Sequence, residues 1–403
     1  MRSMKKLKIL VLVLLIGTIS LSLIYKNKNE VTKIKRKKQS NLAIMIKEDG
    51  AEDYTKSSSK DIPKGNYVLN RDKSYCKNNG VIGNYDSTLG KVSFSFIGTD
   101  SCYLYFDYEV PGVKFETAFA ANDVDIFNEN GLRYEGANPN NYICLDNKTN
   151  GACSDSSLLF RIIGLFDEDT STDGTTSSGT KKLLKIIDTN NYGGTSGKCW
   201  DSNGKNNWST ATLKIELNGT YLTDLLETAN VNGKLSSAIV NAKWHLGGAS
   251  SSNYLTLTAE GIYTQERNTS AIYSGNPSSI YAKVGLMYPS DYGYATTGSS
   301  TTSKSNCRMK ELYNWDDSSF SDCKNNDWLF TSQSGFINDT EWMISPYSSY
   351  LRYAARLDKT GFVNRYGGDT GTLYAVRPTF YLDSSTIKIV GGTGTSTDPY
   401  HIG

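Results

Sequence analysis

Apolar and polar positions divide the chain into stretches of different character. Residues 9–25 form an uncharged, mostly aliphatic run, and residues 41–65 are polar after their first few positions. From Asn66 onward, apolar stretches of strand length alternate with loops rich in Ser, Thr, Gly and Asn. Such a pattern is typical of short strands joined by turns. It predicts an α+β, β-rich fold behind an N-terminal transmembrane helix.

Several segments each have the pattern of a particular strand, hairpin or helix. Residues 91–108 alternate around an Ile-Gly-Thr-Asp turn and predict a hairpin. The apolar run 158–166 predicts a buried strand, with residues 181–187 returning after a turn-rich loop. Residues 210–229 have helical spacing and predict two short helices that break at Gly219. The remaining expectations are apolar strands at 239–246 and 281–287 and a weakly patterned connecting segment at 110–140.

Charge is distributed unevenly along the chain. Residues 1–40 hold eleven Lys and Arg and a single acidic residue, Glu30, for a balance of +10. Since the whole chain has 43 basic and 41 acidic residues, residues 41–403 keep 32 basic and 40 acidic ones, a balance of −8. A mildly acidic folded part argues against nucleic acid as a partner, because phosphate binding needs a basic face. The basic stretch beside an apolar run favours a membrane surface.

The apolar run predicts membrane contact. As a helix, residues 9–25 would span about 26 Å, and Leu7 with the flanking lysines extends this toward a ~30 Å hydrocarbon core. No A-x-A-like cleavage site follows, which favours an uncleaved anchor at 7–25 over a cleaved signal peptide, and both readings mean export. The basic residues after the run outnumber those before it, which the positive-inside rule would keep in the cytoplasm. A long folded domain can translocate despite such charges.

The number and spacing of the cysteines indicate the compartment in which the protein resides. All seven cysteines lie beyond residue 75, and none has the C-x-x-C spacing of a zinc or redox site. Proximity suggests disulfides in an oxidising compartment, although sequence alone leaves the connectivity open. Cys199 is left over as a free thiol or an alternative partner. We expect a single-pass protein of the cell membrane with an extracellular C-terminal part. The suggested pairs are Cys76 with Cys102, Cys144 with Cys153, and Cys307 with Cys323.

Several motifs in residues 141–403, about two thirds of the chain, are similar to those of a known family. They are FRIIG at 160–164, LLKIID at 183–188, WSTATL at 208–213, EWMISP at 341–346, GFV at 361–363 and AVRPTFYL at 375–382. Together they resemble a domain of unknown function in exported Firmicutes proteins. Its closing pattern looks like the C-type-lectin-like fold of formylglycine-generating-type enzymes and retroelement-diversified binding proteins. The resemblance implies a small twisted β-core that displays long irregular loops.

Three domains follow from the pattern and the resemblance. Residues 1–40 are expected to form a membrane anchor and basic stalk, 41–130 a small β-rich domain, and 131–403 the C-type-lectin-like domain. Within the last of these, Arg377 stands in an otherwise apolar strand and is expected to need a buried ion pair or carbonyl cap. Pro378 is expected at the start or edge of a strand.

Motifs for catalysis and cofactors are weak. Asp169-x-Ser171-x-Asp173-Gly174 begins like a calcium loop, but Thr180 stands where a bidentate Glu is needed, so a solvated hairpin loop is the better reading. The chain has two histidines that could act as bases, His245 and His401, and His245 follows an apolar strand. We therefore expect no metal, no cofactor and, on balance, no enzyme. A carbohydrate-active enzyme remains an alternative, because sequence cannot place two carboxylates in space.

One C-terminal stretch suits recognition. Residues 347–366 interleave aromatic and guanidinium groups, which binding surfaces favour for their large contact area and hydrogen bonding. The alternative is a strand pair whose alternate tyrosines face the core. We expect an extracellular binding protein that recognises a glycan or a surface-protein ligand, with a structural envelope protein as the second reading. The candidate ligand-binding residues are Tyr347, Tyr350, Arg352, Tyr353, Arg356, Arg365 and Tyr366.

Overall fold

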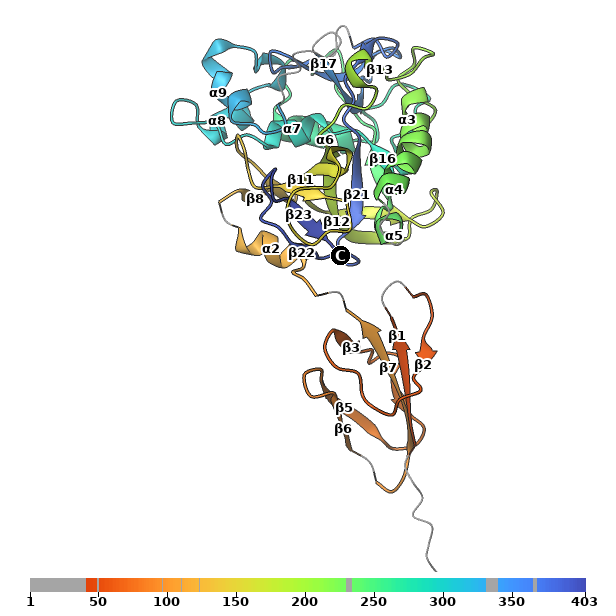
Figure 1. Ribbon diagram of the computed structural model, residues 1–403. Helices are drawn as coiled ribbons and strands as arrows, with labels where there is room; N and C mark the ends of the chain where they lie inside the picture. Colours follow the sequence, from red (N-terminus) through yellow and green to blue (C-terminus); the bar gives the residue numbers. More distant parts are fainter. Residues whose placement is uncertain are drawn as a thin grey trace, which may run out of the picture. The chain divides into compact units, whose positions relative to one another are not determined.

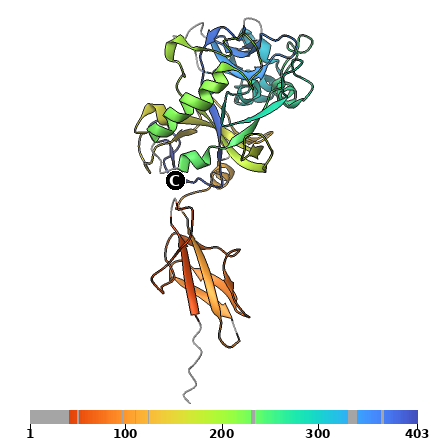
Figure 2. The same ribbon diagram turned by 90° about the vertical axis from the view of Figure 1, so that its right-hand side faces the viewer.

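The computed structural model describes residues 41–48, 51–95, 97–109, 111–122, 124–229, 234–330, 340–364 and 368–403. The chain forms one unit that ends at Glu109 and a second that begins at Val110 (Figures 1 and 2). The sequence had placed this boundary after residue 130. The segment 110–140, expected to be a connection, instead supplies α2 (Phe115–Ala121), β8 (Ile126–Asn128) and β9 (Leu132–Tyr134) to the second unit.

The first unit is built from short strands around a small apolar core. β1 and β7 pair in parallel at the centre of its main sheet, whose order is β2-β1-β7-β3, with β4 also on β7. Ile44, Leu104 and Phe106 form the buried centre. The strands are β1 (Asn41–Lys47), β2 (Thr55–Lys56), β3 (Tyr67–Leu69), β4 (Tyr75–Cys76), β5 (Val81–Asp86), β6 (Lys91–Ser95) and β7 (Ser101–Tyr108).

The hairpin predicted for 91–108 is wrong, although both of its strands exist. β6 pairs with β5 in a separate two-stranded sheet, whereas β7 joins the main sheet. The segment between them therefore carries the chain from one sheet to the other. A period-two pattern specifies strands and their faces but not their partners, so it could not separate these two arrangements.

The second unit is organised around a large mixed sheet. Its principal order is β16-β21-β12-β11-β10-β23-β22, with β9 and β14 also on β11, β8 on β9, and β15 on β14. The strands not yet bounded are β10 (Tyr142–Cys144), β11 (Leu159–Ser171), β12 (Gly179–Asp188), β14 (Asn241–His245), β15 (Ser279–Ala282), β16 (Val284–Gly285), β21 (Thr379–Asp383), β22 (Ile389–Gly391) and β23 (Tyr400–Ile402).

Smaller sheets and short helices complete this unit. β13 (Lys198–Cys199) pairs with β20 (Leu373–Tyr374), and β17 (Thr340–Pro346), β18 (Ala354–Asp358) and β19 (Val363–Asn364) form a further sheet. The other helices are α3 (Thr212–Glu216), α4 (Leu222–Ala229), α5 (Lys234–Ala238), α6 (Ala259–Arg267), α7 (Pro289–Tyr294), α8 (Lys304–Met309) and α9 (Ser321–Asn325). Single turns lie at η1 (Ser156–Leu158), η2 (Gly194–Ser196), η4 (Leu312–Asn314) and η5 (Ser318–Phe320).

The apolar runs predicted a buried strand and its return, and these form the long hairpin β11–β12 within the large sheet. Its pairing extends to Thr170 and Gly179, so strand structure covers part of the expected loop. In the remaining turn, the carboxylate of Asp173 accepts hydrogen bonds from the backbone N–H groups of Thr175 and Thr176. These bonds hold the pKa of Asp173 well below its usual value. The hairpin-loop reading of this acidic stretch is confirmed.

The helix at 212–229 does not break at Gly219. A π turn, η3 (Leu217–Tyr221), joins α3 to α4 without interruption. Leu213 and Leu217 are buried before Gly219, and Tyr221, Leu222 and Leu225 are buried after it, so the apolar face continues past the glycine. A π turn can lie within a helix without ending it. The break had been predicted from Gly219, because glycine weakens a helix.

The fold class expected from the sequence is wrong. The described chain is a mixed α/β structure with many strands and few helices, in which a long central hairpin organises the second unit. No helix within the described ranges combines the length and apolar character that crossing a membrane requires. The predicted anchor at 7–25 and basic stalk lie outside the described residues.

All three predicted cysteine pairs form disulfides. The bonds join Cys76 to Cys102 in the first unit, and Cys144 to Cys153 and Cys307 to Cys323 in the second. Cys199 is the free cysteine among the described residues. Disulfides persist in oxidising compartments, so this pattern fits an extracellular protein.

Arg377 is buried and paired, as its place in an apolar strand predicted. Its Nε and Nη2 donate to the two carboxylate oxygens of Glu341 at 2.8 and 2.9 Å, and Nη2 also donates to the Leu329 carbonyl at 2.8 Å. Pro378 directly precedes β21, where its missing N–H is tolerated. This ion pair joins β17 to the segment that leads into β21, and thus fixes the small sheet that carries the site described next.

Candidate functional site

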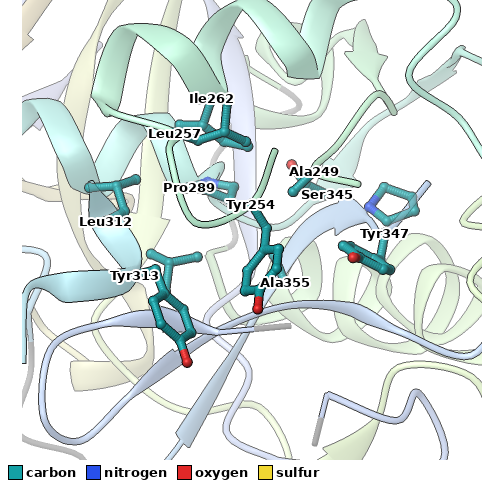
Figure 3. Close-up of a pocket in the computed structure, with 12 residues that line it drawn as sticks. Ala249, Tyr254, Leu257, Ile262, Pro289, Leu312, Tyr313, Ser345, Tyr347 and Ala355 are labelled. Atoms are coloured by element: carbon teal, nitrogen blue, oxygen red, sulfur yellow. The ribbon is translucent and has the colours of Figure 1, made fainter. Parts of the chain in front are cut away.

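An apolar pocket lies on the second unit where α6, α7, η4 and the sheet β17–β18–β19 meet (Figure 3). It contains about 470 Å³ of space, counting the solvent at its mouth. Pockets for small ligands have mostly hydrophobic and aromatic walls with a few placed polar groups. The lining residues are Ala249, Tyr254, Leu257, Ile262, Pro289, Leu312, Tyr313, Ser345, Pro346, Tyr347, Ala355 and Val363.

The pocket has a buried floor and a half-buried aromatic rim. Ile262, Pro289 and Leu312 are buried in the floor, from α6, α7 and η4 respectively. Tyr254 and Tyr313 are half-buried, and their rings meet edge to face with centroids 5.4 Å apart. Figure 3 shows both phenol hydroxyls on the side away from the aliphatic floor residues. A ligand that enters the pocket would first contact the tyrosine rings of the rim and then the aliphatic side chains of the floor.

Ser345 supplies a polar atom to this apolar floor. The residue lies in β17 and is only 2 % exposed. Its hydroxyl has no hydrogen-bond partner among the residues that the structure describes. Buried polar groups are nearly always paired, and leaving one unpaired costs about 1–3 kcal/mol. An unpaired hydroxyl in a pocket floor therefore points to a partner that a ligand brings.

Two glycines allow the pocket wall to form. Gly247 and Gly248 follow β14, and a Cβ on either would overlap backbone oxygens of α6 or of Pro346. The next residue, Ala249, lines the pocket, and its carbonyl accepts hydrogen bonds from the backbone N–H and the hydroxyl of Ser348 at 2.8 and 3.0 Å. The Gly-Gly pair thus lets one wall approach β17 closely enough to close the pocket.

Asn206 positions the loop that follows β17. Its side-chain amide donates to the carbonyls of Tyr347, Tyr350 and Tyr353 at 2.8, 2.9 and 2.8 Å. Its backbone N–H donates to the Leu351 carbonyl at 2.6 Å. Asn206 itself is fully buried. One amide therefore organises the loop that carries most of the predicted tyrosines, a role that sequence reasoning missed because Asn206 lies about 140 positions away in the chain.

The structure brings the predicted tyrosines together. Tyr347 is buried and lines the pocket, whereas Tyr350 is 50 % exposed. Their rings stack with centroids 5.9 Å apart, and Tyr353 meets each of them edge to face at 6.5 and 6.0 Å. Tyr350 therefore extends the aromatic surface outward from Tyr347. The ligand-binding role assigned to these residues remains a prediction.

The predicted arginines are placed differently from one another. Arg352 is two-thirds exposed and pairs with Asp369 at 2.6 Å. Arg356 is mostly buried, where it pairs with Asp358 at 3.2 Å and contacts the Thr340 hydroxyl at 3.1 Å. It thus stabilises the sheet β17–β18 and lies away from the loop surface. Arg365 and Tyr366 lie outside the described residues.

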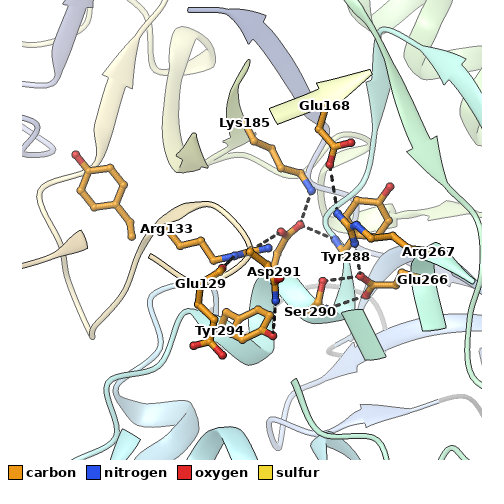
Figure 4. A network of polar contacts seen from close by, with 12 residues as sticks. Glu129, Arg133, Glu168, Lys185, Glu266, Arg267, Tyr288, Ser290, Asp291 and Tyr294 are labelled. Carbon is orange, nitrogen blue, oxygen red and sulfur yellow. Dashed lines mark hydrogen bonds and ion pairs between the residues drawn. The ribbon is translucent and has the colours of Figure 1, made fainter. Parts of the chain in front are cut away.

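A buried network of charges joins α6 and α7 to strands of the large sheet (Figure 4). In α7, the backbone N–H and hydroxyl of Ser290 donate to the carboxylate of Glu266 in α6 at 2.9 and 2.5 Å. Asp291 accepts from Lys185 at 2.5 Å and from Arg133 at 3.1 Å. Although burial acts to raise it, Lys185 and Arg133 hold the pKa of Asp291 below its usual value.

The network holds part of the pocket floor in position. Pro289, the neighbour of Ser290, lines the pocket, so the contacts that Glu266 and Asp291 make fix the position of this floor residue. The side chains of Asp291, Lys185 and Arg133 are at most 3 % exposed, and none of the three is among the residues that line the pocket. The signals that would have found the network are single charges inside apolar runs, such as Lys185 in KKLLKII.

Other chemistry-bearing groups lie apart from the pocket. His401 is buried between Asp146, at 3.2 Å, and the Gly151 carbonyl, at 2.8 Å. His245 lies 3.6 Å from Glu168. The described Cys/Asp clusters with metal-like spacing each contain both sulfurs of a disulfide, which leaves one carboxylate ligand apiece. Among the described lining residues there is no Asp, Glu, His, Lys, Arg or Cys. The described floor thus offers contacts to an apolar group and one hydroxyl, that of Ser345, for a hydrogen bond.

No family model, curated protein or solved structure matches the chain, so the resemblance drawn from its motifs stays a prediction.

Proposed function

We propose that this chain is an extracellular binding protein that takes its ligand into the pocket between α6, α7 and β17. The disulfides support residence outside the cytoplasm. The apolar run at 7–25 supports retention at a membrane surface. Recognition rests on the second unit, where the pocket and the exposed Tyr350 and Arg352 adjoin.

The observation that carries the proposal is the composition of the pocket. Ser345 lines the pocket together with aliphatic and tyrosine side chains, and its hydroxyl has no hydrogen-bond partner among the described residues. Binding sites combine apolar walls with a few placed polar groups in this manner. Catalysis by nucleophile or acid–base would need a titratable partner beside the hydroxyl, and the described lining residues include no carboxylate, imidazole or amine.

A pocket-filling variant tests the proposal. Ala355 in β18 lines the rim, so Ala355→Phe should occupy the space that a ligand needs. Ala120→Phe in α2 is the matched control, because Ala120 is exposed and is not among the lining residues. Full-length protein in detergent would be screened by ligand-detected NMR against aromatic fragments, aliphatic fragments, peptides and glycans.

We expect at least one class to bind wild type and Ala120→Phe, and to lose at least tenfold in affinity with Ala355→Phe. Comparison in the same detergent removes the signal from partition into micelles. If no compound loses affinity in Ala355→Phe while that variant still unfolds cooperatively, the pocket is not a binding site and the proposal fails.

A further inference from the structure

We propose that the occupant of this pocket is the phenol ring of a tyrosine side chain, presented by a partner polypeptide. This inference rests on the proposed function and specifies its ligand. The carrying observation is the combination of the Ser345 hydroxyl, which has no partner among the described residues, and the tyrosine rings that line the same pocket.

The floor favours a ring with little polarity. Ile262, Leu312 and Pro289 present aliphatic carbon, and both Pro289 and Pro346 lack a backbone N–H. A pyranose would bury several hydroxyls here, each of which needs a partner or weakens binding by roughly five- to a hundredfold. The rings of Tyr254, Tyr313 and Tyr347 offer edge and face contacts to a flat aromatic ligand. The floor chemistry therefore selects an aryl group over a sugar.

Ser345 selects an aryl group that carries one polar atom. A serine hydroxyl can donate or accept, so it can pair with a phenol oxygen in either sense. A purely apolar ring would leave this hydroxyl unpaired in the complex, as it is among the described residues of the free protein. A phenol satisfies it and adds no second polar group to the floor. The tyrosine side chain is the polypeptide group with this chemistry.

The surface beside the pocket favours a polypeptide as the source of the ring. Tyr350 stacks on Tyr347 and is half exposed. Beyond it, Arg352 projects into solvent in its ion pair with Asp369. Tyrosine and arginine are enriched in protein interfaces, where they supply contact area and hydrogen bonds to a peptide backbone. A free phenol would leave this surface unused.

The first test separates the hydroxyl from the rest of the pocket. Affinities of p-cresol and toluene would be measured by ligand-detected NMR for full-length wild type, Ser345→Ala and Ala355→Phe in the same detergent. We expect Ser345→Ala to weaken p-cresol binding by roughly three- to tenfold and to leave toluene unchanged, since one neutral hydrogen bond is lost. Ala355→Phe should weaken both.

The second test identifies the source. A heptapeptide with a central tyrosine should bind wild type more tightly than its phenylalanine counterpart, with the difference abolished in Ser345→Ala. Equal loss of p-cresol and toluene in Ser345→Ala, equal binding of the two peptides, or a glycan that binds better than every peptide would overturn the inference. Each of those results leaves the proposed function standing as long as Ala355→Phe still blocks the ligand.

Discussion

Gly248 lies directly against the carbonyl of Pro346, so closely that a Cβ at position 248 would overlap that oxygen. The contact joins the segment after β14 to the end of β17, which are about a hundred residues apart in the chain. It sets the separation between Ala249 and Tyr347, which both line the pocket. The part of the pocket wall that these two residues form is thus fixed by backbone packing as well as by side chains.

Adding a methyl group at this contact should destabilise the protein. We expect Gly248→Ala to lower the free energy of unfolding by about 1–3 kcal/mol, because the backbone must shift to relieve the overlap. Gly219→Ala is the matched control: nothing lies within 4 Å of a Cβ there, and alanine in a helix should stabilise by about 0.5–1 kcal/mol. Chemical denaturation measures both. Equal effects of the two variants would contradict the proposed packing.

Loss of the amide at Asn206 should loosen the loop that follows β17. Asn206→Ala removes the donor for the carbonyls of Tyr347, Tyr350 and Tyr353. Because the amide has two N–H groups for these three carbonyls, at about 1 kcal/mol for each hydrogen bond the unfolding free energy should fall by about 2 kcal/mol. Hydrogen exchange should rise first in the loop 347–353. Asn325→Ala, at an exposed position, should change stability by less than about 0.5 kcal/mol.

Ser345→Ala should have opposite effects on stability and on binding. The hydroxyl is buried without a partner in the described structure, so its removal spares a desolvation cost. Unfolding free energy should stay constant or rise by up to about 1 kcal/mol. Thermal unfolding in the absence of ligand measures this. A loss of more than about 1 kcal/mol would show that Ser345 is hydrogen-bonded in the free protein.

Titration of Glu266 should make stability depend on pH. Burial raises the pKa of Glu266 from 4.5 to about 7. Because the folded pKa lies above the unfolded one, the contribution is complete below pH 4.5 and is lost as pH rises through 7. Glu266→Gln cannot ionise, so it should gain about 3 kcal/mol relative to wild type between pH 4.5 and 8. Glu260→Gln, exposed on the same helix, should show no such trend.

Oxidation of the cysteines can be counted directly. The described pairs consume six of the seven cysteines and leave Cys199. Protein recovered without reductant and unfolded in denaturant should therefore react with one equivalent of thiol reagent per chain. Three or more equivalents would contradict an extracellular, oxidised protein. Mass spectrometry of Cys307→Ser should then show Cys323 as the additional reactive thiol.

Local features of the sequence predicted local features of the structure. The cysteine pairs, the strands of the hairpin β11–β12, the position of Pro378 at the start of a strand and the burial of Arg377 with an acidic partner could all be predicted. Each depends on short-range pattern or on the cost of burying one residue. The partner of each strand could not be predicted, because β6 and β7 show the same period-two pattern whether or not they pair with each other.

The pocket was only partly visible in the sequence. Tyr347 and Tyr350 belong to a conspicuous aromatic stretch, but Tyr254 and Tyr313 approach them only through tertiary packing. Arg356 belongs to the same stretch of sequence, but it lies in β18 and its side chain contacts the Thr340 hydroxyl within the sheet. The pair Gly247-Gly248 indicated a close approach of the backbone, but the segments that it contacts could not be predicted because they lie elsewhere in the chain.

The most direct test of the account is a crystal structure of the full-length protein with bound p-cresol. The account predicts a ring beside Tyr254, Tyr313 and Tyr347, with its oxygen within about 3 Å of the Ser345 hydroxyl. An empty pocket with p-cresol bound elsewhere would contradict the claim that this pocket is the binding site.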